Sequence, residues 1–111
     1  MAYKRLGKTE LTGTGWVTLY TVPGSKEAII SSIHFVNIHA TVNNTVNLAH
    51  RDGALANEDY ILYKEPLWFQ GGANHISVQL GITMAAAELI AVKTDSAGSV
   101  AVQIWGEEKD A

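Results

Sequence analysis

Four histidines and several carboxylates are the residues of this 111-residue chain best suited to chemistry. A zinc site needs three or four ligands that converge on one point. His34 and His39 are five residues apart, so on one strand their side chains would point to opposite faces. His50 and His75 fall near the ends of other predicted strands, and the chain has no cysteine. The sequence therefore favours ordinary strand and loop histidines over a metal site, and we expect no metal and no cofactor.

Acidic residues gather in the loop over residues 52–59, which reads Asp-Gly-Ala-Leu-Ala-Asn-Glu-Asp. Its oxygen atoms are of the kind that binds Ca²⁺, but their spacing differs from that of an EF-hand loop. Polar residues that turn the chain explain the loop better. Glu58-Asp59 and Glu107-Glu108 are neighbours in sequence, so they indicate solvated faces and not the two facing carboxylates of a glycoside hydrolase.

The sequence patterns that mark nucleophilic or phosphate chemistry do not occur in the chain. It contains neither a Gly-x-Ser-x-Gly elbow nor Ser-x-x-Lys, and Gly71-Gly72 is followed by Ala-Asn-His instead of Lys-Ser or Lys-Thr. Ser31 and Ser32 lie in an apolar strand, where we expect them to fill small spaces. A catalytic triad is defined by its geometry and not by its sequence order, so the lack of these motifs is only indirect evidence against a triad. We expect no enzymatic activity.

Composition and charge restrict the partners that this chain can bind. The net charge is −3 and the eight basic residues are mostly scattered, whereas nucleic-acid binding needs clustered Lys and Arg. The chain has no long apolar run that would span a bilayer. Charged residues make up 17% of the chain, which is typical both of a surface covered by other proteins and of a strand-rich protein. We therefore expect protein partners, and neither nucleic acid nor a membrane.

Apolar and polar residues alternate in several segments, which is the period of a β-strand with one buried face. In residues 99–105, for example, every second residue is Val or Ile. Further strands are predicted over residues 16–22, 28–38, 42–50, 59–63, 74–82 and 88–94. Residues 28–38 carry apolar side chains on both faces, which indicates a central strand with a β-bulge near Ser31 and Ser32.

Turn signals separate these segments at short spacing, and helical tendency is confined to residues 54–58 and 84–89. The second of these is more typical of a turn that leads into a strand. The sequence predicts an all-β fold, namely a single antiparallel β-sandwich of jelly-roll type with about seven to eight strands. Residues 1–14 are predicted to form an N-terminal arm or a first strand, residues 15–106 the sandwich, and residues 107–111 a short acidic tail.

Aromatic and charged residues are the candidates for contacts with other proteins. Trp68 and Phe69 lie either over the core as a lid or at a protein interface, where Trp and Tyr dominate the binding energy. A sugar-stacking platform is a third alternative. Tyr60 and Tyr63, with Tyr20, are predicted to line a similar patch. The two chain ends are either solvated or join copies of the chain head to tail through opposite charges. The charged candidates at the ends are Lys4, Arg5, Lys8, Glu107 and Glu108.

Three segments carry a specific combination of strands and turns. Residues 20–34 read Tyr-Thr-Val-Pro-Gly-Ser-Lys-Glu-Ala-Ile-Ile-Ser-Ser-Ile-His, which is a strand, a Val-Pro turn and a long apolar strand. Residues 36–49 form an Asn-rich hairpin pattern, and residues 81–92 read Gly-Ile-Thr-Met-Ala-Ala-Ala-Glu-Leu-Ile-Ala-Val before the last strand. Together these segments resemble a small β-sandwich family that recurs in the particles of tailed bacteriophages. The chain departs from that family in having Pro-Gly-Ser for Pro-Ala-Gly and Met84 for Leu, and neither change disturbs the turns.

The resemblance covers residues 16–106 and implies a structural role in a phage particle. Members of the family lie on the capsid surface, in the neck and in the tail, and no catalytic residues carry over. We expect a virion accessory protein, either a capsid decoration or cement protein or a neck or collar subunit. It would contact other virion proteins and copies of itself, after assembly in the cytoplasm of an infected bacterium. The alternative is a tail-tip receptor-binding or lectin-like module, with a site made of surface aromatics and residues 52–59.

Overall fold

The computed structural model of this chain describes residues 3–69 and 74–110, so the predicted turn at Gly71-Gly72 lies outside the described residues. The described chain forms eight strands and one turn of 3-10 helix, η1 (Asn57–Asp59). The strands are β1 (Lys4–Leu11), β2 (Val17–Thr21), β3 (Lys26–Asn37), β4 (Asn44–Arg51), β5 (Tyr60–Leu67), β6 (His75–Met84), β7 (Leu89–Thr94) and β8 (Val100–Asp110).

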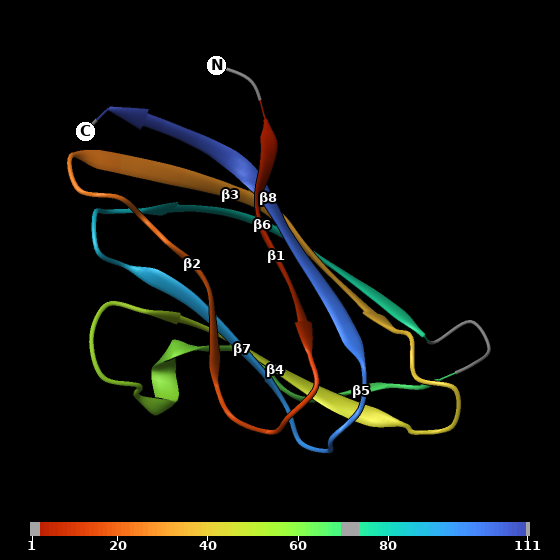
Figure 1. The fold of residues 1–111 in the computed structure, drawn as a ribbon. Coiled ribbons are helices and arrows are strands. Elements are labelled where there is room, and N and C mark those ends of the chain that lie inside the picture. The colour runs from red at the N-terminus through yellow and green to blue at the C-terminus, as the bar shows by residue number, and fades with distance from the viewer. Residues whose placement is uncertain (1–2, 70–73, 111) are drawn as a thin grey trace.

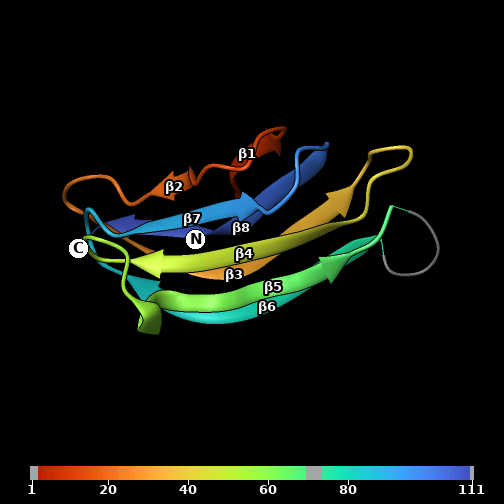
Figure 2. The same cartoon turned by 90° about the horizontal axis from the view of Figure 1, so that it is seen from below.

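The strands form two four-stranded antiparallel sheets that pack face to face (Figures 1 and 2). Sheet A has the order β1-β8-β3-β6, and sheet B has the order β2-β7-β4-β5. The chain changes sheet after most strands, so all neighbours in a sheet except β4 and β5 are distant in sequence, as in a jelly roll. The all-β sandwich predicted from the sequence is confirmed. In the part of the chain that the structure describes, no helix has the length and apolar character to cross a membrane.

The core lies between the two sheets and is filled by alternate residues of the strands. On β8, Val100, Val102 and Ile104 are fully buried, as the alternation predicts. They face Leu48 and Val92 of sheet B, which are equally buried. Burial of each such side chain stabilises the fold by about 1.5–3 kcal/mol. Because the chain has no cysteine, this apolar packing replaces any disulfide framework.

Strand β3 lies inside sheet A and contains the bulge that its sequence predicts. Ile30 and Ile33 are three residues apart, so a regular strand would place them on opposite faces. Against β8, the register shifts by one residue between Ile30 and Ser32. Both isoleucines, and Phe35 after them, are fully buried. The extra residue, Ser31, therefore returns the second half of β3 to the core face.

Gly106 of β8 lies opposite Ile30, at the edge of this bulge. A Cβ atom at position 106 would collide with the backbone carbonyl oxygen of Ile29 and would lie 3.1 Å from Cα of Ile30. The backbones of β3 and β8 approach each other so closely here that only a residue without a side chain fits. The bulge and this glycine are therefore one structural feature.

The acidic tail predicted for residues 107–111 is, in its described part, a strand. Residues 107–110 form the end of β8 and pair with the start of β3. Glu27 and Lys109 face each other in this ladder and form an ion pair of 2.9 Å. A run of charged residues at a strand end has the same composition as a solvated tail, so the sequence does not separate the two. At the other terminus, residues 4–11 form strand β1.

The two segments with helical tendency also have defined structures. Residues 84–89 connect β6 to β7 by a turn in which Ala87 has a positive φ of 73°, so no helix forms there. This agrees with the predicted turn into a strand. In the other segment, the 3-10 turn η1 begins at Asn57 and leads directly into β5.

A buried asparagine at the end of β3 ties the β3–β4 connection to the end of β5. The amide nitrogen of Asn37 donates to the carbonyl oxygens of Val42 and Leu67, at 2.9 and 3.0 Å. Its side-chain oxygen accepts a hydrogen bond from the backbone N–H of His39 at 3.0 Å. This network holds the end of β5, and hence the start of the segment that carries Trp68, in place.

We expect Gly106→Ala to destabilise the protein by about 1–3 kcal/mol, because the new methyl group overlaps the β3 backbone at the bulge. Urea unfolding followed by far-UV circular dichroism measures the effect. Gly81→Ala on β6 is the matched control, since no atom lies within 4 Å of a Cβ at that position. Equal stability of the two variants would contradict the close approach of β3 and β8.

Candidate functional site

An aromatic cluster lies on the outer face of sheet B. The ring centroid of Tyr60 is 5.8 Å from that of Trp16 and 5.2 Å from that of Tyr63, with the two tyrosines edge to face. Tyr60 shares its face with Ala49, its partner on β4, and this alanine has no exposed surface. A small residue in the central strand β4 thus leaves room for the large ring of Tyr60 beside it. Tyr63 stays 64% exposed, so the cluster presents a ring to solvent.

Two lysines and one carboxylate surround this cluster. The Nζ atom of Lys93 lies 5.6 Å from the centroid of the Trp16 ring, and that of Lys64 lies 5.5 Å from the Tyr63 ring. Both distances are in the range of cation–π contacts. Asp95 lies between the lysines, with its Oδ1 3.8 Å from Lys64 and 3.7 Å from Lys93. The face of sheet B therefore combines aromatic surface with a compensated set of charges.

The carboxylate of Asp95 is held by neighbours on β4 as well. Its Oδ2 accepts hydrogen bonds from the Thr45 hydroxyl and, at 3.1 Å, from the Asn47 amide. Burial alone would raise the pKa of Asp95, but the hydrogen bonds from Thr45 and Asn47 and the charges of Lys64 and Lys93 outweigh it and leave the pKa below its usual value. Asp95 is therefore a stable anion that organises the surface.

A shallow hollow lies beside the aromatic cluster, lined by Asn57, Tyr60 and Tyr63. Asn57 begins η1 at the end of the acidic 52–59 loop, so this loop and the two tyrosines adjoin, as the lectin-like alternative requires. The hollow is open to solvent and offers an amide group next to two phenol rings. Such a set can bind the face of a sugar or an aromatic side chain of another protein.

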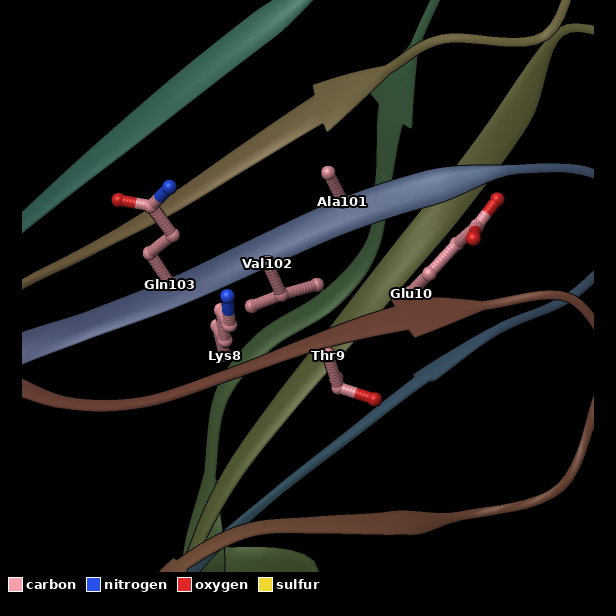
Figure 3. A pocket seen from close by; sticks show the side chains of 6 residues that line it. All are labelled: Lys8, Thr9, Glu10, Ala101, Val102 and Gln103. Carbon is pink, nitrogen blue, oxygen red and sulfur yellow. The ribbon is translucent and has the colours of Figure 1, made fainter.

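The outer face of sheet A is also hollowed. Figure 3 shows one hollow between β1 and β8, over the short side chain of Ala101. Lys8 lies opposite Gln103 and Glu10 opposite Ala101 in the β1–β8 ladder, so the three long polar side chains frame the hollow. Arg5 lies opposite Trp105 on this same face. Two of the predicted basic interface residues, Arg5 and Lys8, thus belong to one surface.

A second hollow on sheet A contains a pair of histidines that the sequence analysis did not bring together. His34 of β3 and His75 of β6 stack with ring centroids 5.8 Å apart and an angle of 9° between the rings. Trp105 and Gln103 line the same hollow, and the indole N–H of Trp105 donates to the Gln103 side-chain oxygen at 3.1 Å. The two histidines come from different strands, and only knowledge of the β3–β6 register predicts their contact.

The four histidines and the acidic loop are the residues whose side chains could bind a metal ion. Over residues 3–69 and 74–110, no group of three or more His, Asp or Glu side chains is placed to hold a metal ion. His39 instead accepts backbone hydrogen bonds from Thr41 and Val42, at 3.1 Å each. His50 contacts Glu88 at 2.7 Å. Each of these two histidines therefore has a local structural contact.

The predicted aromatic residues fall at two separate places. Trp68 and Phe69 follow the end of β5, whereas the tyrosine cluster lies at its start, so the structure does not bring the two sets together. Trp68 is 45% exposed, and the Phe69 backbone N–H donates to the Asn43 side chain at 3.2 Å. Such exposure argues against Trp68 as a lid of the core. Its role as an interface residue remains a prediction.

Tyr20 does not belong to the aromatic patch in which the sequence analysis placed it. Its side chain is buried, and its hydroxyl donates to Oε2 of Glu108 at 2.5 Å. Burial, and then the hydrogen bond to Glu108, raise the pKa of Tyr20 far above its usual value. Trp16, which directly precedes β2, belongs to the patch instead, since its ring centroid lies 5.8 Å from that of Tyr60. A tryptophan after Gly13-Thr14-Gly15 gives no signal in the sequence for this contact.

The charged residues of the two chain ends meet each other within one chain. Nζ of Lys4 lies 3.7 Å from Oε1 of Glu108, and the other oxygen of this carboxylate, Oε2, accepts the hydrogen bond from Tyr20. Glu107 lies opposite Ile29 of β3. Because Lys4 and Glu108 already contact each other, they contribute less to a head-to-tail joint than free charges would.

Comparison with known proteins shows which folds this chain resembles. No known family model and no curated protein sequence matches it. A chain in the acidic stable capsid structure of Helicobacter pylori bacteriophage KHP30 superposes with a TM-score of 0.60 at 11% identity, over 99% of this chain and 100% of that one. A chain of the cyanophage Pam1 capsid asymmetric unit gives a TM-score of 0.54 at 15% identity, over 94% and 83%. The Drosophila NLP core, described in connection with pentamer formation and histone binding, gives 0.53 at 16%, over 96% and 100%. At these identities the similarity shows a common fold.

We expect Asp95→Asn to lower the free energy of unfolding at pH 7 by about 1 kcal/mol, because it weakens charge-assisted contacts at a partly exposed site. The pKa of Asp95 is lowered in the folded state, so its contribution is present above the unfolded pKa and is lost as the pH falls through the folded pKa. The stabilities of variant and wild type should therefore converge in strong acid. Thermal unfolding at several pH values measures this, with Asp52→Asn, in an exposed loop, as the control. A difference that stays constant with pH would contradict it.

Proposed function

We propose that this chain is an accessory structural protein of a bacteriophage virion that binds to the capsid surface. The observation that carries the proposal is the similarity of nearly the whole chain to chains in two phage capsid structures. Coverage of 99% of this chain and 100% of the KHP30 chain means that the two folds correspond from end to end. Both phage structures are described as capsids, and this favours a capsid decoration or cement protein over a neck or collar subunit.

The surfaces of the chain support a role in binding other proteins. The outer faces of both sheets carry aromatic side chains, and charged residues make up only 17% of the chain. Interfaces are rich in Tyr, Trp and Arg, and depleted of other charged residues at their centres. The proposed mechanism is burial of apolar surface and pairing of sheet edges, repeated by the symmetry of the particle. It includes no catalytic step and no cofactor.

Trp68 is the proposed anchor of the contact with the particle. It is a large side chain that remains 45% exposed, and the Asn37 network fixes the strand end before it. A rigid aromatic residue loses little conformational entropy on binding, so it contributes more to affinity than a flexible one. Phe69, held to Asn43 through its backbone, lies beside it.

The purified chain should co-sediment saturably with virions that lack it, and Trp68→Ala should weaken this binding by at least about tenfold, the loss typical of an interface anchor. Tyr3→Ala is the control, because it removes an exposed ring at the opposite end of the sandwich. Equal affinities of wild type and Trp68→Ala would remove Trp68 from the contact. Failure of the wild-type chain to bind any particle would overturn the proposed function itself.

A second candidate function is a receptor-binding or lectin-like module. The observation that favours it is the hollow lined by Asn57, Tyr60 and Tyr63 next to the acidic loop. Exposed aromatic rings with a neighbouring amide suit the apolar face and hydroxyl groups of a sugar.

If the chain binds glycans, Tyr63→Ala should abolish retention on a glycan array or on host cells, while Tyr63→Phe, which keeps the ring, should retain most of it. Because Tyr63 is exposed, we expect both variants to fold as the wild type does. No retention of the wild-type protein on either surface would eliminate this candidate. If Tyr63→Ala is retained as well as the wild type, the glycan site does not include Tyr63.

A further inference from the structure

The sandwich has four edge strands, and three of them carry features that hinder pairing with a further strand. Charged residues, proline, bulges and short length are the usual protections of an edge. β1 reads Lys-Arg-Leu-Gly-Lys-Thr-Glu-Leu and has a register shift. β2 is only five residues long and also has a shift. β5 contains Lys64, Glu65 and Pro66 and has two register shifts against β4.

The fourth edge, β6, is ten residues long and lacks charge and proline along its described length, His75–Met84. Its residues include no proline and no Asp, Glu, Lys or Arg. It has one register shift against β3, where the step from Gln79 to Ile82 opposes the shorter step from Ser32 to Ile30, but the alternation of exposed and half-buried residues continues through this shift. A long, uncharged edge of this kind is suited to strand addition.

The backbone of β6 offers free hydrogen-bonding groups on its outer side. The N–H of Asn37 donates to the carbonyl oxygen of Asn74 at 2.9 Å, which makes these two residues a hydrogen-bonded pair. Hydrogen-bonded and non-hydrogen-bonded pairs alternate along an antiparallel ladder. The N–H and C=O groups of His75, Ser77 and Gln79 therefore point away from β3, toward the open edge.

The side of the sandwich at β6 is also less completely packed than the opposite side. At β1 and β2 the backbones nearly touch, since a Cβ on Gly7 would lie 2.7 Å from the carbonyl oxygen of Leu19. Figure 2 shows β5 and β6 at the other side, as the corresponding edges of the two sheets. The apolar residues that remain partly exposed along this side are Ile61, Leu62, Ile76, Val78, Leu80 and Ile82.

We propose that β6 pairs antiparallel with β6 of a second copy of this chain, so that the A sheets of two copies form one continuous sheet. The inference deepens the proposed structural role, on which it rests, by naming the edge and the partner. Each copy would supply three outward N–H groups from His75, Ser77 and Gln79, and would cover the partly exposed apolar side chains of the other.

The residue pattern of β6 favours a copy of itself over an unrelated strand. Apolar residues stand at equal distances on both sides of Gln79, so antiparallel self-pairing about this residue places Val78 against Leu80 and Ile76 against Ile82. On the outer side, His75 then stands against Thr83, Ser77 against Gly81, and Gln79 against its own copy. A charge on the two-fold axis would face its own copy, and β6 has no Asp, Glu, Lys or Arg there or elsewhere to cause such repulsion.

Two substitutions test the proposal on the full chain. Ser77→Pro removes an N–H group that points to the open edge and leaves the ladder to β3 intact. Gln79→Lys keeps the backbone and places two positive charges face to face in the paired edge. Sedimentation velocity over a range of concentrations should show a dimer for the wild type, and a dissociation constant raised by at least about tenfold in both variants.

Thr18→Lys is the matched control, because it adds the same charge to an exposed residue of the protected edge strand β2. Its dimer should dissociate as the wild type does. Unchanged circular dichroism spectra show that the variants fold, and Gln79→Lys still tests the edge if Ser77→Pro does not fold. A wild-type chain that is monomeric at all concentrations, or a dimer indifferent to Gln79→Lys, would overturn the proposal.

Co-sedimentation of the same variants with virions separates this proposal from the proposed function. If the wild type is monomeric in solution but binds particles, and Gln79→Lys abolishes that binding, then a strand of another virion protein occupies the edge and the second copy is excluded. If the β6 dimer forms and no particle binds it, the virion role fails while the pairing stands. Dimer formation and particle binding together support both.

Discussion

The bulge at Ser31 in β3 is the constraint on which most of the structure depends. β3 pairs with both β8 and β6, so its register decides which side chains of sheet A face the core. If β3 ran through Ser31 as a regular strand without a bulge, the half of β3 after it would turn over, and Phe35 would face solvent while His34 entered the core. Gly106 makes the bulge possible by letting the two backbones meet. One inserted residue and one missing side chain thus determine both the core and the outer face of sheet A.

The same register explains why the outer face of sheet A is hollowed and polar. With Ile33 and Phe35 directed inward, β3 presents His34 and Val36 outward, beside Gln103 and Ala101 of β8. Large rings and small residues alternate across this face, so hollows form between them. On sheet B, Ala49 plays the corresponding part beneath Tyr60. The surfaces available for contacts are therefore set by the positions of small outward residues as much as by the aromatic ones.

The strands, the sandwich and the bulge could be predicted from the sequence, because each leaves a local signal in the period of apolar residues. The bulge, for example, appears as a change of parity at Ser31 and Ser32. The candidate surfaces could be predicted only in part. Tyr60 and Tyr63 are close in sequence and were grouped correctly, whereas Trp16 joins them through the pairing of distant strands. In the sequence, Tyr20 is equivalent to these two tyrosines. The local pattern near a turn does not indicate which face of the sheet a residue occupies, nor does it predict the hydrogen bond of Tyr20 to Glu108.

Period-two alternation does not distinguish an edge strand from a central one, so the sequence alone does not identify β6 as an edge. β6 and the core strand β8 share the same apolar alternation over residues 76–82 and 100–104. What differs is the neighbour: β8 is paired on both sides, whereas β6 is paired on one. A central strand commonly lacks charge and proline, so their absence is informative only when the strand order shows that β6 is an edge. Natural sheets protect their free edges, so an unprotected edge indicates a strand that is covered in the working assembly. The strand order therefore converts an ordinary sequence feature into evidence for a partner.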